Sequence, residues 1–523
     1  MTPRCFFLAL LAFACPGRGL VAQAVVGPHP APAGDVARSV ATARPAWLDR
    51  GRRLLEVEDP LAAWRVFRGA QPSGAEQVEQ RLGLGRALLM LGHAEQATAL
   101  GEQSVLQAPA RQDAMSLTVR GLIRARRFDE AVLRSRRYLD RAGAPSAELL
   151  AARGSSLFRV QRTGDAADVY QEVVALDSDH AEAHLRLGSG LLDPVVVEVP
   201  PKLERAVAAV AAGDRPEGAR LMQEVLAEHP GHPIAHRLLG EALFAERTAS
   251  CMAMQSEAFG RLAACAPAPD NRELRVGEFV PAYRRVSAPR RAVIDRTCAM
   301  FGSRLARLIQ AGGRHDLLAE LERTTDAPTR ENLRGRRTFD GRVWDDVRGV
   351  GGLRAATGIE ALDEAASFGF DTFAHEVAHQ VHFFTFSPLE RARVRSLYKL
   401  ALAEGRCLDY YAASNEAEYF GQGVEAFVSL AKRPGAETTH GHTRWELLRV
   451  DPDLYAFIAE LVDFDPLLDA PRRDELLSAS AAAALRCGRP RDAQILAEQM
   501  PPGPARRRLQ ASVDRAAREL RPQ

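Results

Sequence analysis

The sequence predicts a mainly α-helical protein, in which an α–α superhelix precedes an α+β domain. Its 523 residues, 46% hydrophobic and 26% charged, have the composition of a soluble globular protein of about three domains. From about residue 50 to 265, apolar residues recur at helical spacing with self-similarity of about 34 residues. Between about 270 and 466 this register disappears, and short strand and turn patterns replace it.

The overall charge is close to neutral. Lys+Arg minus Asp+Glu is 69 − 67 = +2, and Arg4 and Arg18 in the first 24 residues account for the excess. No basic patch suited to nucleic acid stands out, so we expect no nucleic-acid partner. No stretch reaches the ~20 apolar residues of a membrane helix, so we expect no transmembrane helix.

Residues 1–24 have the pattern of a signal peptide. A short charged start at Arg4 precedes an apolar run, and Ala22–Gln23–Ala24 has the small-x-small form of a cleavage site. We therefore expect an exported protein, periplasmic or extracellular, cleaved near Ala24. The alternative is a membrane-anchored lipoprotein whose mature chain begins at Cys15.

Cysteine usage leaves one pairing open. Seven cysteines fall to five when residues 1–24 are removed, and an odd number cannot all pair within one chain. Cys251 and Cys265 lie close in sequence and could form a disulfide in an exported chain. Burial of all five as small apolar residues is an equally supported interpretation.

Residues 25–48 are predicted to be a flexible linker, because their Pro-, Ala- and Gly-rich composition cannot bury enough apolar surface. Helical repeats follow over residues 49–268. In the clearest unit, Gly85 and Ala97 fall where two helices must touch closely, and Pro109 falls where the second helix must stop. Leu187–Gly188 and Leu239–Gly240 repeat the Leu-Gly pair.

These repeats resemble the tetratricopeptide repeat family. The resemblance implies a concave surface for a peptide or protein partner, with a scaffold that has no ligand as the alternative. Residues 469–523 contain one similar helix pair, which we expect to cap or extend the array.

The segment after the repeats begins with strand and turn patterns. Residues 339–344 and 347–352 read as short strands with turns. The glycines of 349–352 indicate a turn beside a strand, because no Lys-Ser/Thr follows as a phosphate loop requires.

The residues that point to chemistry are His375–Glu376–Val377–Ala378–His379, on a helix that Asp371 can cap. Two imidazoles four residues apart project from one face and can bind one Zn²⁺. Glu376 can take a proton from the metal-bound water, whose pKa zinc lowers toward neutrality.

A third ligand must come from elsewhere. His382 shares the helix face but lies seven residues from His375, about 10 Å along the axis, so we expect it to be structural or to line the cleft. After a helix that begins at Ser387, Ser414 or Asn415 can start another helix with Glu418 in its first turns. That carboxylate would complete a His₂Glu site.

The pairing of this motif with Tyr411-x-x-x-Asn415-Glu416-Ala417-Glu418-Tyr419-Phe420 resembles the lethal-factor-like gluzincin zinc peptidases, a family that includes the Pro-Pro endopeptidases. The resemblance implies a zincin-type α+β domain over residues 269–468. It implies that His375, His379 and Glu418 bind Zn²⁺, that Glu376 is the general base, and that Tyr411 donates to the oxyanion. Tyr410 is a rival donor. The chain departs from the family at Gly421–Gln422–Gly423, which leaves open whether Glu416 or Glu425 orients a histidine.

The function expected from these features is that of an exported zinc-dependent endopeptidase, which hydrolyses a peptide or protein substrate and uses its repeat array to bind a partner or the substrate. The stretch from Ala355 to Leu362 is expected to pair with substrate as an edge strand. The alternative is a non-catalytic, repeat-based binding scaffold with a remnant zincin fold. The intact Glu376 argues against it, because metal binding alone does not require that carboxylate.

Overall fold

A computed structural model describes residues 45–194, 197–265, 269–432, 441–465, 467, 473–486 and 488–520, all within one compact unit, Pro45–Gln523. The predictions for the signal peptide and for Cys15 lie outside the described residues, as does the side chain of Cys265 and with it the proposed disulfide. Residues 46–48, assigned to the linker from sequence, belong to the first helix.

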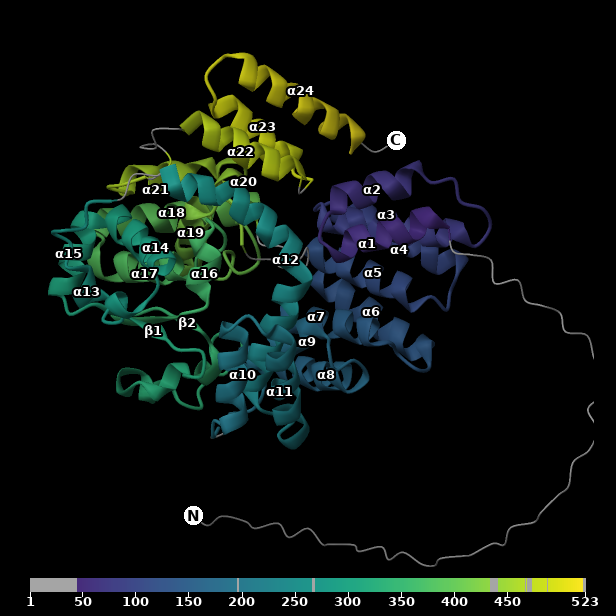
Figure 1. Cartoon of the computed structure of the whole chain (residues 1–523), viewed down its shortest axis with the longest axis horizontal. Coiled ribbons are helices and arrows are strands. Elements are labelled where there is room, and N and C mark those ends of the chain that lie inside the picture. Colours follow the sequence, from purple (N-terminus) through teal and green to yellow (C-terminus); the bar gives the residue numbers. More distant parts are fainter. Residues whose placement is uncertain are drawn as a thin grey trace, which may run out of the picture. The chain divides into compact units, whose positions relative to one another are not determined.

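The first part of the described chain is a series of helices, each packed against its neighbours in sequence (Figure 1). It confirms the predicted succession of helical pairs. The elements are α1 (Ala46–Glu56), α2 (Pro60–Gly69), α3 (Glu76–Met90), α4 (Ala94–Gln107), α5 (Gln112–Arg124), α6 (Phe128–Ala142), α7 (Ala147–Arg159), α8 (Thr163–Leu176), α9 (Ala181–Arg186), the π-helical turn η1 (Leu187–Leu191), α10 (Pro201–Ala211), α11 (Arg215–Glu228) and α12 (Pro233–Cys265).

Small residues mark the close contacts between these helices, as the repeat pattern predicts. Ala97 on α4 is fully buried. A Cβ placed on Gly85 of α3 would stand 2.5 Å from the side chain of Leu117 on α5. A Cβ on Gly240 of α12 would stand 2.6 Å from the backbone nitrogen of Leu185 on α9. A larger side chain at Gly240 would therefore push α12 away from the backbone of α9, and one at Gly85 would displace the Leu117 side chain.

The second part combines helices with a small sheet. Its elements are α13 (Val276–Phe279), η2 (Tyr283–Arg285), α14 (Ala288–Met300), α15 (Gly302–Gln310), β1 (Arg314–Leu318), η3 (Thr324–Asp326), η4 (Pro328–Leu333), η5 (Trp344–Asp346), β2 (Gly349–Val350), β3 (Arg354–Gly358), α16 (Ala361–Ala366), α17 (Thr372–Thr385), α18 (Pro388–Glu404), α19 (Glu416–Val428), α20 (Arg444–Val450) and α21 (Pro452–Leu461). The described chain is thus mainly α-helical, as predicted. Within the described residues, no helix is both long enough and apolar enough to cross a membrane.

The sheet has the strand order β1-β3-β2, with β1 parallel and β2 antiparallel to β3. The prediction that residues 355–362 form an edge strand is wrong, because β3 has a partner on both sides and the chain enters α16 at Ala361. A fully buried sequence such as Ala355–Ala356 suits the centre of a sheet better than its edge. The edge strands of this sheet are β1 and β2, and β2 lies in the glycine-rich segment expected to form a turn beside a strand.

Helix α17 packs on the apolar core and is joined to the sheet through the side chain of Gln380. Val377, Ala378 and Val381 on this helix are fully buried. Gln380 donates to the backbone oxygens of Arg314 and Leu353, at 3.0 and 3.2 Å. Because these bonds join the helix to the strand ends, the sheet sets both the position and the rotation of α17.

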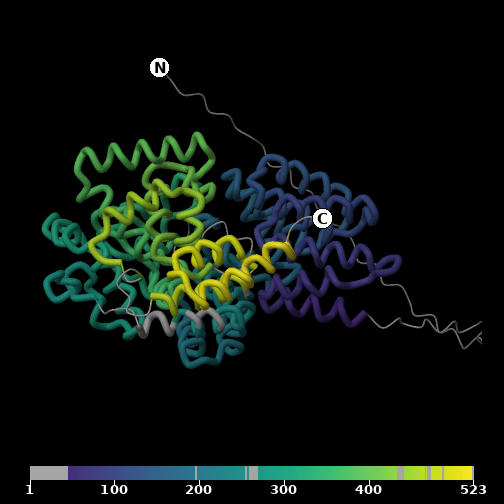
Figure 2. Tube along the Cα trace, turned by 90° about the horizontal axis from the view of Figure 1, so that it is seen from above, coloured from purple at the N-terminus to yellow at the C-terminus, as the bar shows by residue number. Residues whose placement is uncertain are grey.

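The C-terminal helices are α22 (Arg473–Arg486), α23 (Pro490–Gln499) and α24 (Pro504–Glu519). They contain the predicted helix pair, with Gly488 in the turn at φ +73°. A Cβ on Gly488 would collide with the side chain of Leu91, after α3, and Arg65 on α2 donates to Glu519 at 2.9 Å. These helices, yellow in Figure 2, therefore contact the first repeats.

Candidate metal centre

Three predicted ligands meet at one point. The Nε2 atom of His375 lies 3.1 Å from Oε2 of Glu418, and the Nε2 atom of His379 lies 3.5 Å from the same oxygen. One ligand atom from each of the three residues falls within 4.8 Å of the others. Among the described residues this is the one such group of three that could hold a metal ion.

The spacing and the donor types fit zinc. Ligand atoms 2.0–2.1 Å from a tetrahedral Zn²⁺ stand roughly 3.3–3.4 Å apart, and both histidine–carboxylate distances lie close to that value. Two neutral imidazoles and one carboxylate are the ligand set of a catalytic zinc, which keeps a fourth position open. A calcium or magnesium site would instead collect oxygens.

Local sequence explains why α17 presents its two histidines. Asp371 caps the helix, as predicted, because its Oδ1 accepts from the backbone N–H of Ala374 at 2.9 Å. The histidines are four residues apart, so they project from adjacent turns of one face. Their rings lie 4.6 Å apart at nearly a right angle.

Helix α19 supplies the carboxylate. Of the two candidate caps it is Asn415 that begins the helix, since its Oδ1 accepts from the N–H groups of Ala417 and Glu418, both at 3.0 Å. Glu418 is thereby fixed in the first turn, facing α17. The preceding helix, α18, begins after Ser387 as predicted, and a capping box there pairs Ser387 with Glu390.

Glycines make room around the site. A Cβ on Gly421 of α19 would stand 2.9 Å from Cε1 of His375 and equally close to Cε1 of His379. On the other side, a Cβ on Gly349 of β2 would stand 2.5 Å from Oε1 of Glu376, and one on Gly351 would stand 3.2 Å from Cβ of His379. A glycine at position 421 therefore leaves room for both imidazoles.

Charges in the site favour an ionised carboxylate. Although burial raises the pKa of Glu418, the bonded imidazoles of His375 and His379 hold it well below its usual range. Burial alone lowers the pKa of His375, but the Glu418 and Glu425 carboxylates raise it well above its usual value. The Nδ1 atom of His375 lies 3.4 Å from Oε2 of Glu425, longer than a formed hydrogen bond, so the carboxylate lies beside the ring nitrogen that an orienting group would bond.

Glu376 lies buried beside these ligands. Burial raises its pKa, and the imidazoles of His375 and His379 oppose that effect. Its Oε2 atom has no hydrogen-bond partner within the described part of the chain. A buried carboxylate with a raised pKa and an unused oxygen can accept a proton from a bound water.

Tyr411 and Tyr410 differ in their surroundings. The Tyr410 hydroxyl accepts from Nη1 of Arg159 at 2.9 Å. Tyr411 packs against Phe339, with ring centres 5.7 Å apart. Burial and the Glu418 carboxylate raise the pKa of Tyr411 well above its usual range, against the effect of the Arg342 guanidinium. Its phenol therefore keeps its proton and can donate.

The remaining candidates lie outside the ligand group. His382 is buried, its Nε2 atom is 3.6 Å from Oε1 of Glu416, and burial lowers its pKa to about 4. Glu416 also accepts from Arg395 at 3.1 Å. Of the two carboxylates left open from sequence, the structure thus places Glu425, and not Glu416, against a proposed ligand.

Sequence reasoning missed two residues near the site. Arg342 was included only in a strand-and-turn pattern, yet its charge is close enough to affect the pKa of both Glu376 and Tyr411. Phe339 is 53% exposed and covers Tyr411. The sequence places an aromatic residue, Phe339, two positions before the glycine turn at Gly341. It cannot show that this residue contacts Tyr411, 72 residues later, because that contact depends on the tertiary structure.

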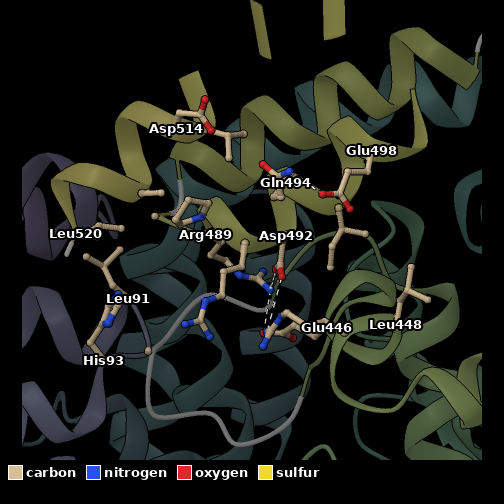
Figure 3. A pocket seen from close by; sticks show the side chains of 18 of the residues that line it. Leu91, His93, Glu446, Leu448, Arg489, Asp492, Gln494, Glu498, Asp514 and Leu520 are labelled. Carbon is tan, nitrogen blue, oxygen red and sulfur yellow. Dashed lines mark hydrogen bonds and ion pairs between the residues drawn. The ribbon is translucent and has the colours of Figure 1, made fainter. Parts of the chain in front are cut away.

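A separate cavity of about 1150 Å³ lies between the α3–α4 turn, α20 and the C-terminal helices (Figure 3). Among the residues that line it, Arg489 bonds to Glu446 at 2.9 Å and also to Asp492. The proposed zinc ligands are not among the described residues that line it. We assign it no part in the metal chemistry.

Comparison with known proteins gives little beyond the geometry. No protein-family model and no curated protein matches the chain. Among solved structures, a thermophilic TPR protein of Thermus thermophilus is 17% identical, with 38% of this chain and 97% of that one covered and a TM-score of 0.27. YrrB, a TPR protein with an unusual peptide-binding site, is 15% identical over 38% of this chain and 90% of its own, with a TM-score of 0.22. Yeast Tom70 is 12% identical over 91% of this chain and 95% of its own, with a TM-score of 0.21. At such low scores these similarities carry no argument.

Proposed function

We propose that the chain is a zinc-dependent endopeptidase of the lethal-factor-like gluzincin type, carrying a tetratricopeptide-like array that binds a partner or the substrate. The observation that supports it is the convergence of His375, His379 and Glu418, with ligand atoms within 4.8 Å, beside the buried carboxylate of Glu376. The proposal includes the exported location expected from residues 1–24.

His375, His379 and Glu418 would hold the metal. When bound there, Zn²⁺ supplies Lewis-acid chemistry, which polarises a peptide carbonyl and lowers the pKa of water toward neutrality. Glu376 takes a proton from the attacking water at its unused Oε2 and passes it to the nitrogen of the leaving amine. The Tyr411 hydroxyl donates to the carbonyl oxygen as negative charge develops there.

The decisive variant is Glu376→Gln, measured on the zinc-loaded full chain with a degenerate peptide library. Peptide cleavage should fall by at least about 10²-fold, the lower end of what a positioned base contributes, because an amide cannot take the proton. Zinc content should stay near that of the wild type, since Glu376 is not a ligand. Cleavage at the wild-type rate in this variant would refute the mechanism.

A second candidate function is a non-catalytic protein-binding scaffold. The helical pairs of α1–α12 favour it, because such arrays commonly form binding surfaces. Zinc content and library digestion discriminate between the two. A wild-type chain that binds zinc stoichiometrically but cleaves nothing in the library would favour the scaffold.

A further inference from the structure

The loop that carries Tyr411 is held from two sides. It connects α18 to α19. Within its own part of the chain, Oδ1 of Asp409 accepts from the N–H groups of Tyr411 and Ala412, at 2.9 and 2.8 Å. The Oδ2 atom of the same carboxylate lies 3.3 Å from Nε2 of His442. These contacts hold the backbone of the loop at Tyr411 and Ala412 from within the second part of the chain.

The same loop is also bonded to the helical array. Arg126, in the turn between α5 and α6, donates from Nη2 to the backbone oxygens of Cys407 and Leu408, at 3.0 and 2.8 Å. Arg159, the last residue of α7, donates to the Tyr410 hydroxyl and places its guanidinium 4.6 Å from the centre of that ring. Both arginines thus contact residues within four positions of Tyr411.

The segment that covers Tyr411 is joined to the same array. The N–H of Val343 donates to the backbone oxygen of Gly190, in η1, at 2.7 Å. Arg337 donates to Asp193 at 2.8 Å. Phe339, which packs on Tyr411, lies between these two attachments. Tyr411 and the Phe339 ring that packs on it therefore lie in two segments, each bonded to the repeats.

We infer that the helical array is a working part of the proposed catalytic site, and that Arg126 and Arg159 are positioning residues for the Tyr411 hydroxyl. The inference rests on the proposed function. Its physical basis is that a hydrogen-bond donor stabilises developing charge only when it is held in place before the reaction. One segment that the array binds is thus the chain's own loop between α18 and α19, which contains Tyr411.

Burial makes the arginine of α7 the stronger contact. Arg159 is 7% exposed, so its bond to Tyr410 is shielded from water, where charge-assisted hydrogen bonds are strongest. Arg126 has a left-handed backbone, φ +61°, which glycine adopts without strain. Arg126→Gly therefore removes the side chain without straining the turn, and Arg159→Met keeps most of the aliphatic bulk.

The test uses the zinc-loaded full chain and the library peptide that the wild type cleaves fastest. Arg159→Met and Arg126→Gly should each lower kcat about tenfold, with zinc content unchanged. Combined with Tyr411→Phe, neither should lower kcat further, because both act through that hydroxyl. The matched control is Arg162→Met, since Arg162 is exposed on the same array and pairs with Asp165 three residues away; it should keep the wild-type kcat.

A second measurement needs no activity. Hydrogen exchange of the backbone over residues 406–414 should become faster in Arg159→Met and Arg126→Gly and stay unchanged in Arg162→Met. The inference is overturned if exchange there is unchanged in both variants, or if their kcat losses add in full to that of Tyr411→Phe. A wild type without cleavage would instead refute the proposed function, and the exchange result would still report whether the arginines hold the loop.

Discussion

Gly421 lies directly against His375, 46 residues earlier in the chain: a Cβ on this glycine would stand 2.9 Å from Cε1 of the imidazole and 3.0 Å from Nε2. Real Cβ atoms seldom come that close, so a side chain here would displace the ring. Because Nε2 is the proposed ligand atom, the absence of a side chain at Gly421 is a condition for the metal site.

Gly421→Ala should therefore weaken zinc binding although alanine favours a helix over glycine by about 1 kcal/mol. We expect at least a tenfold rise in the zinc dissociation constant, measured by competition with a chelator. The control is Gly164→Ala in α8, where the added Cβ meets nothing within 4 Å. Unchanged zinc affinity in Gly421→Ala would mean that the imidazoles can shift without loss of the site.

Glu418→Ala should cost the chain its metal, because two imidazoles alone leave the site short of a ligand. The measurement is zinc per chain after dialysis. Glu416→Ala is the matched control, two residues away on the same helix, and it should keep its zinc because Glu416 bonds to Arg395 instead. Full zinc loading of Glu418→Ala would show that the third ligand is misassigned.

Glu425→Gln should weaken zinc binding without abolishing it. The carboxylate lies 3.4 Å from Nδ1 of His375, and loss of a carboxylate that orients a zinc-binding histidine typically costs about 10–100-fold in metal affinity. Cleavage should recover at high zinc concentration, which separates this role from that of Glu376. Glu460→Gln, an exposed carboxylate on α21, is the control. Equal affinity in the two variants would contradict the orienting role.

Local signals predicted a large share of the fold and the site. Asp371 and Ser387 are helix caps because their side chains bond to N–H groups three residues ahead, a range that sequence can read. The His375–His379 spacing likewise fixes a shared helix face. Both kinds of prediction depend on neighbours within one or two turns.

What sequence could not supply depends on contacts between distant segments. Strand β3 lies at the centre of the sheet because β1 and β2 pair with it on either side. Its own sequence does not show these partners, and for that reason the prediction of an edge strand was wrong. The contact of Arg159 with Tyr410 spans 251 positions and joins the two parts predicted as separate domains. No local pattern encodes such a pair.

The pH dependence of stability should report on His315, which joins α17 to the sheet. This residue is fully buried on β1, with Nδ1 3.1 Å from Oε1 of Gln380 and Nε2 2.9 Å from Oγ1 of Thr357. Burial, only partly opposed by the bond to Gln380, lowers its pKa to about 4, from an ordinary value of 6.5. The native protein therefore holds a neutral imidazole at this position.

Because the pKa is lower in the folded state than in the unfolded state, the unfolded chain binds the extra proton between pH 6.5 and 4. The free energy of unfolding therefore has its full value above pH 6.5. It falls by roughly 3 kcal/mol in total as the pH falls through 4. The His315→Asn variant should have a lower melting temperature than the wild type at pH 7. Because asparagine cannot titrate, that temperature should fall less steeply on acidification than the melting temperature of the wild type. His229→Asn, at an exposed position, is the control. Thermal unfolding in chelator from about pH 7 to about 4.5 provides the comparison, and parallel curves for wild type and His315→Asn would exclude His315 as the titrating group.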